Sequence, residues 1–251
     1  MGPPQSSRAL ILRTRAYGES DRIVTFLAED HGKLTGIAKG ARNSKRRFAN
    51  CLNPFTLVRV HFRQRRSATL VFMDSCDLLR LPDTLAEPLK FAYGSYLVEL
   101  VDLLTVEAEP VPKTFDLLAN ALDALRTGPA TPAFLRSFEL HLLADAGFAP
   151  RLDGCDSCQE ELAAGTPCGF DATTGALLCS TCKTRRENLV DVSEAVRAAL
   201  VRLIDLDPAA ARSLRLPGDV RGETADLLGR WLSLHLPRPL KSLGLIESLT
   251  R

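Results

Sequence analysis

The hydrophobic pattern of this chain changes its period near Leu81 and Pro82, and this change limits the possible folds more than any other feature. Before this point apolar residues alternate with polar ones, as in half-buried β-strands. After it they recur every three to four residues, which is typical of amphipathic helices. The sequence therefore predicts an α+β multidomain protein, with a β domain over residues 1–80 and an α-helical domain over residues 81–251.

Five short segments of the β domain are rich in Ile, Val, Leu, Thr and Phe, and turn-forming residues separate them. The longest connection falls between the third and fourth segments, where an OB-fold carries its extra element. We therefore expect an N-terminal five-stranded OB-fold β-barrel. Its predicted strands are Ala9–Arg15, Arg22–Ala28, Lys33–Ala38, Phe55–Arg63 and Thr69–Asp74.

Two of these segments show which residues share a face. In the fourth, Val58, Val60 and Phe62 point one way, so that Arg59, His61 and Arg63 point the other way. In the first, the same alternation places Leu10 and Leu12 opposite Ile11, Arg13 and Arg15.

Capping signals and apolar stripes predict the helices of the second domain. Thr84-Leu85-Ala86-Glu87 has the pattern of a capping box and opens a helix that continues to Leu104. The other predicted helices are Pro112–Arg126, Pro132–Ala146, Glu194–Leu206, Pro208–Leu214 and Asp219–Leu236.

Five of the seven cysteines lie between residues 155 and 182, and four of them form two CxxC pairs, Cys155 with Cys158 and Cys179 with Cys182. Two such turns that face each other supply four thiolates in a tetrahedron, which suits Zn²⁺. The sequence predicts one structural zinc ion per chain in an insertion at about residues 150–185. Four thiolates leave no position for an activated water, so we expect no catalytic metal. Unused thiols and a redox dithiol are the alternatives, and Cys168 is expected to be a small apolar core residue.

Charge is distributed unevenly along the chain. Residues 1–80 hold 15 Lys and Arg against 6 Asp and Glu, a net charge of +9, whereas the other 171 residues hold 17 against 24, a net charge of −7. Such asymmetry indicates a polyanionic partner. The basic residues lie among strand-like segments and not on one amphipathic helix, which favours nucleic acid over a membrane surface.

The candidate nucleic-acid contacts are cations in two loops and on strand faces, together with one aromatic residue that could stack on a base. An ordinary solvated surface is the alternative interpretation. The candidates are Lys39, Arg42, Lys45, Arg46, Arg47 and Phe48 in the long connection, Arg63, Arg65 and Arg66 at the last turn, and Arg13, Arg15 and Arg59 on strand faces.

Known catalytic signatures are absent from the sequence. It contains no P-loop, GxGxxG, HExxH or GxSxG motif, and its four histidines have no partners at ligand or triad spacing. We therefore expect a protein that is not an enzyme and that has no small-molecule substrate. The N-terminal residues lack the features of a signal peptide, which favours a cytoplasmic, nucleoid-associated protein.

Several short motifs resemble the RecO family of bacterial recombination mediators, in the order expected for the whole chain. Besides the CxxC pairs, they are Gly18-Glu19-Ser20-Asp21, Gly32-Lys33-Leu34-Thr35, Lys39-Gly40-Ala41-Arg42 and Arg238-Pro239-Leu240-Lys241-Ser242.

The resemblance implies an OB-fold, a helical domain and a zinc module. It also implies binding of single- and double-stranded DNA, annealing of complementary strands without ATP, and partnership with RecR and with single-stranded-DNA-binding protein, so that the recombinase RecA can be loaded. Lys39 and Arg42 stand in the matching loop and are implied DNA contacts. The alternatives are an RNA-binding or regulatory protein and a zinc-stabilised enzyme that modifies nucleic acid.

Overall fold

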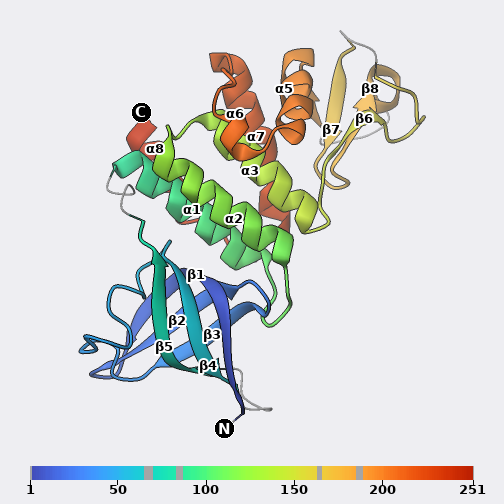
Figure 1. The fold of residues 1–251 in the computed structure, drawn as a ribbon. Coiled ribbons are helices and arrows are strands. Elements are labelled where there is room, and N and C mark those ends of the chain that lie inside the picture. The colour runs from blue at the N-terminus through green and yellow to red at the C-terminus, as the bar shows by residue number, and fades with distance from the viewer. Residues whose placement is uncertain (1, 65–69, 83–86, 163–165, 185–188, 251) are drawn as a thin grey trace. The chain divides into compact units, whose positions relative to one another are not determined.

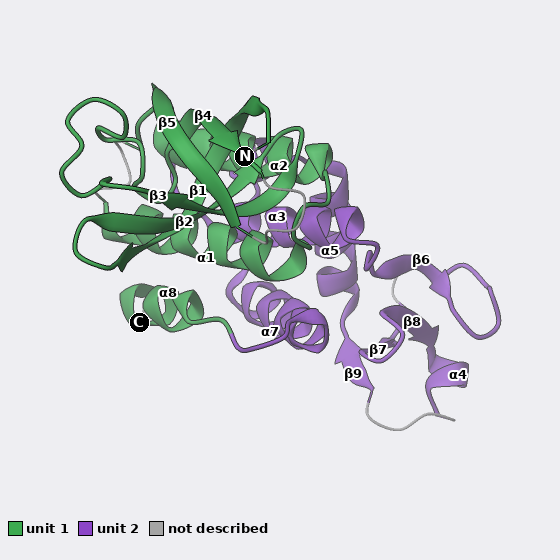
Figure 2. Cartoon of the chain, turned by 90° about the horizontal axis from the view of Figure 1, so that it is seen from below, with its two compact units in different colours: residues 1–127, 240–251 green, residues 128–239 purple. Residues whose placement is uncertain are grey.

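The computed structural model describes residues 2–64, 70–82, 87–162, 166–184 and 189–250. A five-stranded barrel comes first, helices follow it, and a small sheet interrupts the helices (Figure 1). The chain forms two compact units, which Figure 2 shows in different colours. Unit 1 comprises residues 1–127 and 240–251, and unit 2 comprises residues 128–239.

The barrel is closed and has the strand order β1-β2-β3-β5-β4, with β4 pairing back onto β1. Neighbouring strands are antiparallel except β3 and β5, which are parallel. This arrangement confirms the predicted barrel and fits an OB-fold. The strands are β1 (Pro4–Tyr17), β2 (Asp21–Ala28), β3 (Gly32–Ala38), β4 (Leu57–Arg63) and β5 (Leu70–Arg80).

The barrel core contains the apolar face of β4 that alternation predicts, with Val58, Val60 and Phe62 all fully buried. The predicted faces of β1 need a correction. A bulge between Ile11 and Arg13 shifts the register, so that Ile11 packs in the core while Arg13 is exposed. Strict alternation had placed these two residues on the same face.

Pairing with a neighbouring strand, and not residue composition, determines where β1 and β5 begin and end. β1 begins at Pro4 and β5 continues to Arg80, because both extend along β4, where Pro4 pairs with Arg63 and Arg80 with Leu57. β4 begins later than predicted, because Phe55 has a left-handed φ of 71° that ends any extended strand.

Helices α1 (Pro88–Leu104), α2 (Pro112–Thr127) and α8 (Ser242–Thr250) belong to unit 1. The predicted capping box is wrong: Glu87 is the N-cap of α1 and makes no side-chain capping bond, and Pro88 begins the helix. Thr84 itself lies outside the described residues. Helix α8 was not predicted from the sequence. It packs on α1, and at its start the amide and the hydroxyl of Ser242 both donate to the Glu99 carboxylate.

The described part of unit 2 contains helix α3 (Pro132–Asp145), a four-stranded sheet and four further helices. Thr131 caps α3 as predicted, because its hydroxyl accepts from the Phe134 amide. The sheet has the order β6-β8-β7-β9. Its elements and those that follow are β6 (Arg151–Cys155), β7 (Cys168–Asp171), β8 (Ala176–Cys179), α4 (Ser180–Lys183), β9 (Val190–Val192), α5 (Glu194–Asp205), α6 (Pro208–Ala211) and α7 (Gly218–His235).

The predicted domain boundary between residues 80 and 81 stays a prediction. It coincides with the end of β5, whereas the first compact unit also includes α1, α2 and α8. Among the described residues, none of the helices combines the length and the apolar character that a membrane span requires.

Candidate metal centre and nucleic-acid surface

The four cysteines of the CxxC pairs meet in unit 2, with their sulfur atoms all within 4.8 Å of one another. Cys155 ends β6, Cys158 lies in the turn after it, Cys179 ends β8, and Cys182 lies in α4. The parallel pairing of β6 with β8 brings the two turns together. The structure therefore gathers the residues that the CxxC spacing predicted.

The sulfur positions suit a tetrahedral ion. A zinc–sulfur bond of about 2.3 Å places the sulfurs of a tetrahedron about 3.8 Å apart, and the Cys158 and Cys179 sulfurs lie 3.9 Å apart. Cys168 lies outside this cluster and is buried, with its sulfur 3.6 Å from the Val192 carbonyl oxygen. Four close cysteines could thus hold a metal ion, and their thiolates would occupy all four positions of the tetrahedron.

The electrostatics of the cluster also favour a cation. Burial raises the pKa of the Cys155 thiol, but hydrogen bonds from the amides of Cys158, Cys179 and Ser157 lower that pKa to about 6. The Glu160 amide lowers the pKa of the Cys158 thiol, but its hydrogen bonds with the neighbouring thiols raise it to about 12. The pKa is thus lowered at Cys155 and raised at Cys158, and a metal ion bound between the sulfurs would favour the thiolate form of both.

On unit 1, the long connection between β3 and β4 carries a basic loop, residues 39–47. Two amides of this loop donate to the β1–β2 turn and the start of β2, from Arg42 to the Ser20 carbonyl oxygen at 3.0 Å and from Gly40 to the Asp21 carboxylate at 2.8 Å. The Arg42 guanidinium donates to the Glu19 carbonyl oxygen at 2.9 Å. Loop and turn therefore form one surface, on which Arg15, Lys39, Arg42, Lys45 and Arg46 are exposed.

The candidates Arg47 and Phe48 stabilise this loop from within. The Arg47 guanidinium donates to the Lys39 carbonyl oxygen at 2.9 Å and lies 5.3 Å from the centre of the Phe48 ring. Phe48 is only 4 % exposed and belongs to the barrel core. Its buried ring has no free face for a base, so the predicted stacking role of Phe48 is wrong.

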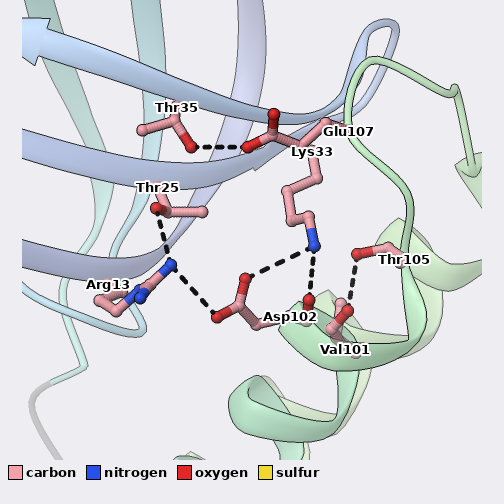
Figure 3. A network of polar contacts seen from close by, with 8 residues as sticks. All are labelled: Arg13, Thr25, Lys33, Thr35, Val101, Asp102, Thr105 and Glu107. Carbon is pink, nitrogen blue, oxygen red and sulfur yellow. Dashed lines mark hydrogen bonds and ion pairs between the residues drawn. The ribbon is translucent and has the colours of Figure 1, made fainter. Parts of the chain in front are cut away.

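Arg13 belongs to a polar network between the barrel and the last turn of α1 together with the segment that follows it (Figure 3). Its guanidinium lies 3.6 Å from the Asp102 carboxylate and 3.4 Å from the Thr25 hydroxyl. Lys33 reaches the same carboxylate at 3.7 Å, and Thr35 donates to Glu107 at 3.0 Å. Arg13 is therefore exposed but already paired with an acid.

The remaining predicted cations lie on β4 and after it. Arg63 pairs with Asp74 at 2.9 Å, and His61 contacts Asp77 at 2.8 Å. Arg59 is exposed and lies opposite Asp77 in the register of β4 and β5. Acids of β5 thus reduce the positive charge of this face, while Arg65 and Arg66 lie outside the described residues.

The residues that sequence analysis missed are the structural partners of these cations. Asp102 and Glu107 gave no signal, because they lie far from the barrel in sequence. Tyr17, at the end of β1, is 53 % exposed and pairs with Asp21, whose carboxylate accepts from the basic loop. Its period-two spacing from Arg13 and Arg15 was the available signal.

Comparison with known proteins matches almost the whole chain. Residues 1–82 match the family model described as "Recombination protein O N terminal", and residues 85–244 match "Recombination protein O C terminal".

Three curated relatives are all named DNA repair protein RecO. The protein from Anaeromyxobacter sp. (strain K) is 38 % identical over 241 residues, which cover 96 % of this chain and 94 % of the relative. The protein from Myxococcus xanthus (strain DK1622) is 41 % identical over 242 residues, 96 % of each chain. The protein from Geobacter sulfurreducens is 35 % identical over 250 residues, 98 % of this chain and 99 % of the relative.

Proposed function

This chain belongs to the RecO family of DNA repair proteins, and on that premise we propose that it binds single- and double-stranded DNA and anneals complementary strands without ATP. Family membership assigns the chain a role in DNA repair and recombination. The family names describe a repair protein and not an enzyme, which agrees with the expectation from the sequence.

The observation that carries the proposal is the joint surface of the basic loop and the β1–β2 turn. Lys and Arg side chains neutralise phosphates and release counterions, whatever the base sequence. Annealing needs this neutralisation on two strands at once, and it needs bases that remain free to pair. The chemistry requires no bond to be made or broken in the DNA.

The same premise supports the proposed partners. We assign RecR and single-stranded-DNA-binding protein as protein partners, with the chain helping to load the recombinase RecA onto coated DNA. The excess of acidic residues after residue 80 makes that part of the chain a poor DNA surface and a suitable one for protein partners.

A zinc ion is the metal that we assign to the four-cysteine cluster. Cys155, Cys158, Cys179 and Cys182 would hold it, and their complete coordination gives it a structural role without an open catalytic position.

Annealing of two complementary oligonucleotides, without ATP and without divalent metal, tests the central proposal. We expect strong acceleration that fades as salt rises, because phosphate contacts compete with salt cations. Tight binding without acceleration would contradict the annealing function.

The double variant Lys39→Glu plus Arg42→Glu tests the surface. If both cations contact phosphates, the slope of log affinity against log salt concentration should shrink by about one to two units. The matched control is Lys113→Glu plus Arg202→Glu, which makes the same change in net charge at exposed positions outside the barrel. An unchanged slope in a folded Lys39/Arg42 variant, or an equal change in the control, would show that these two residues do not contact phosphates.

A further inference from the structure

We propose that Tyr17 is the residue on which an unpaired base stacks, and that it makes this surface prefer single-stranded over double-stranded DNA. The inference rests on the proposed function of the basic loop and adds a base contact to its phosphate contacts. The sequence predicted Phe48 as the stacking residue, but its burial excludes contact with a base.

Tyr17 is the aromatic side chain of the barrel that is available to a ligand. Residues 1–80 contain six Phe and Tyr residues, all of them described, and Tyr17 alone is exposed, at 53 %. Phe26 and Phe62 are fully buried, Phe48 and Phe55 are at most 9 % exposed, and Phe72 is half-buried. Among the Phe and Tyr residues of the barrel, Tyr17 is therefore the one that offers an exposed ring to a base.

The turn that follows Tyr17 leaves space for a nucleotide. Gly18 has a left-handed φ of 57°, and a Cβ atom added there would meet no atom within 4 Å. The side of the turn is thus open to solvent, next to an exposed aromatic ring. The β1–β2 loop is also one of the loops with which OB-folds bind oligonucleotides.

The cations stand on the same surface as the ring. Arg15 precedes Tyr17 by two residues on the same face of β1, because both follow the bulge. Across the turn, Tyr17 pairs with Asp21, whose carboxylate accepts from the Gly40 amide of the basic loop. Lys39 and Arg42 flank this contact, so a strand whose phosphates bind there passes Tyr17.

The other half of this strand face is occupied. The segment after α1 approaches β3 closely, with the Ala108 amide donating to the Lys33 carbonyl oxygen at 2.8 Å and Thr35 bonded to Glu107. Arg13 is paired with Asp102 beside them (Figure 3). This network covers the face beyond Arg13, so DNA on the face is confined to the end that carries Tyr17.

Stacking on Tyr17 requires a base whose face is free, which a duplex does not offer. Phosphate contacts by Lys39 and Arg42 are available to both forms of DNA. The two kinds of contact can therefore be measured separately, because the Tyr17 ring contributes to single-strand affinity alone and the cations contribute to the affinity for both forms of DNA. Annealing needs single strands whose bases remain accessible for pairing, which is the form of DNA that Tyr17 would bind.

The test measures affinity by fluorescence anisotropy for the full-length chain, with a labelled oligothymidylate of about 16 nucleotides and a duplex of the same length, across a range of salt concentrations. For Tyr17→Ala we expect single-strand affinity to fall about fivefold to 100-fold. Duplex affinity should stay within about twofold, and both salt slopes should be unchanged, because no phosphate contact is lost. Tyr17→Phe should bind like the wild type, since the ring remains.

A second readout uses Tyr17→Trp, whose emission a stacked base should quench. The wild type, whose one tryptophan is Trp231, supplies the blank. Three results would overturn the assignment of Tyr17: equal losses of affinity for both DNA forms in Tyr17→Ala, no loss for either form, or no quenching of Tyr17→Trp. None of them would contradict DNA binding by the basic loop. A wild type that binds neither form would overturn the proposed function itself.

Discussion

The ion pair of Lys33 and Asp102 differs from the other barrel ion pairs in its burial. Both side chains are only 12–13 % exposed, and the Lys33 ammonium also donates to the Asp102 carbonyl oxygen. Arg63 and Asp74 form a comparable contact, but each side chain is 42 % exposed. Removing one partner of a buried pair leaves the other charge without compensation, whereas an exposed pair is largely replaced by water.

The variant Lys33→Ala should therefore lose about 2 to 3 kcal/mol of unfolding free energy, somewhat below the loss for a fully buried pair. The matched control Arg63→Ala should lose about 1 kcal/mol or less. Urea denaturation of both variants measures the difference. Equal losses would mean that burial does not decide the strength of these pairs.

His235 is a second residue whose burial has a consequence. Its ring stacks on Phe148, with centroids 3.9 Å apart, and meets the edge of Trp231 at 4.4 Å. Among the described residues its Nε2 atom has no hydrogen-bond partner. Burial lowers the pKa of His235 below its usual 6.5, so the folded state favours the neutral ring.

Because the unfolded chain binds this proton more readily, stability should fall as pH drops through and below 6.5. His235→Phe keeps an aromatic ring and removes the titration. Between about pH 7.5 and about pH 5.5, the wild type should lose more unfolding free energy than the variant. Parallel losses in urea titrations would show that His235 does not contribute to the pH dependence.

At the scale of elements, the motifs that resemble the family are contacts between segments. Gly18–Asp21 and Lys39–Arg42 bind each other across the β1–β2 turn. Gly32–Thr35 holds the last turn of α1 through Lys33 and the segment after it through Thr35. Lys241 and Ser242 attach α8 to Glu99 of α1. Each of these motifs therefore fixes one element against another.

Gly32 shows what such a contact requires of a residue. It has a left-handed φ of 68°, and a Cβ atom there would lie 1.8 Å from the Glu109 carbonyl oxygen. Gly18 has a similar φ of 57° but open space around it. Substitution of Gly18 and of Gly32 therefore separates two losses of stability, one from an unfavourable backbone conformation and one from steric overlap.

Gly18→Ala should cost about 1 kcal/mol, the conformational penalty alone. Gly32→Ala should cost about 3 kcal/mol or more, because the backbone of the segment after α1 must move away. Thermal unfolding of both variants checks the order. A Gly32→Ala variant no less stable than Gly18→Ala would show that the close approach is not required.

At the scale of the whole molecule, two compact units have separate sources of stability. The barrel has a continuous apolar core, whereas the cysteine cluster lies in the small sheet of unit 2. Structural zinc can supply on the order of 10 kcal/mol to a module of this kind. Trp231 of α7 packs edge-to-face on Phe170 of β7, so it lies where loosening of the sheet would be detected.

Chelation of the metal should therefore loosen unit 2 and leave the barrel protected. We expect faster amide hydrogen exchange in β6 to β9 and a shift of Trp231 emission, with barrel peptides unchanged. Cys158→Ser should reproduce this effect, and Cys168→Ser should retain the metal. Zinc content well below one ion per chain in protein purified without chelators would contradict the assignment.

Much of the fold could be predicted from the sequence, because it depends on local patterns. Composition and turn residues located all five barrel strands, capping signals and apolar stripes located α1, α2, α3, α5, α6 and α7, and CxxC spacing gave the four cysteines of the cluster. The strands of the small sheet and helix α8 were not predicted, because they are short and are stabilised by packing against other elements.

The sequence alone determined the composition of the surface, a barrel with excess positive charge and a cluster of thiols. The tertiary structure alone decided which of those side chains are free. A bulge turns Arg13 outward toward Asp102, the loop folds Phe48 into the core, and Tyr17 remains exposed at the end of β1. The physical reason is that burial and ion pairing depend on residues distant in sequence, which local patterns do not record.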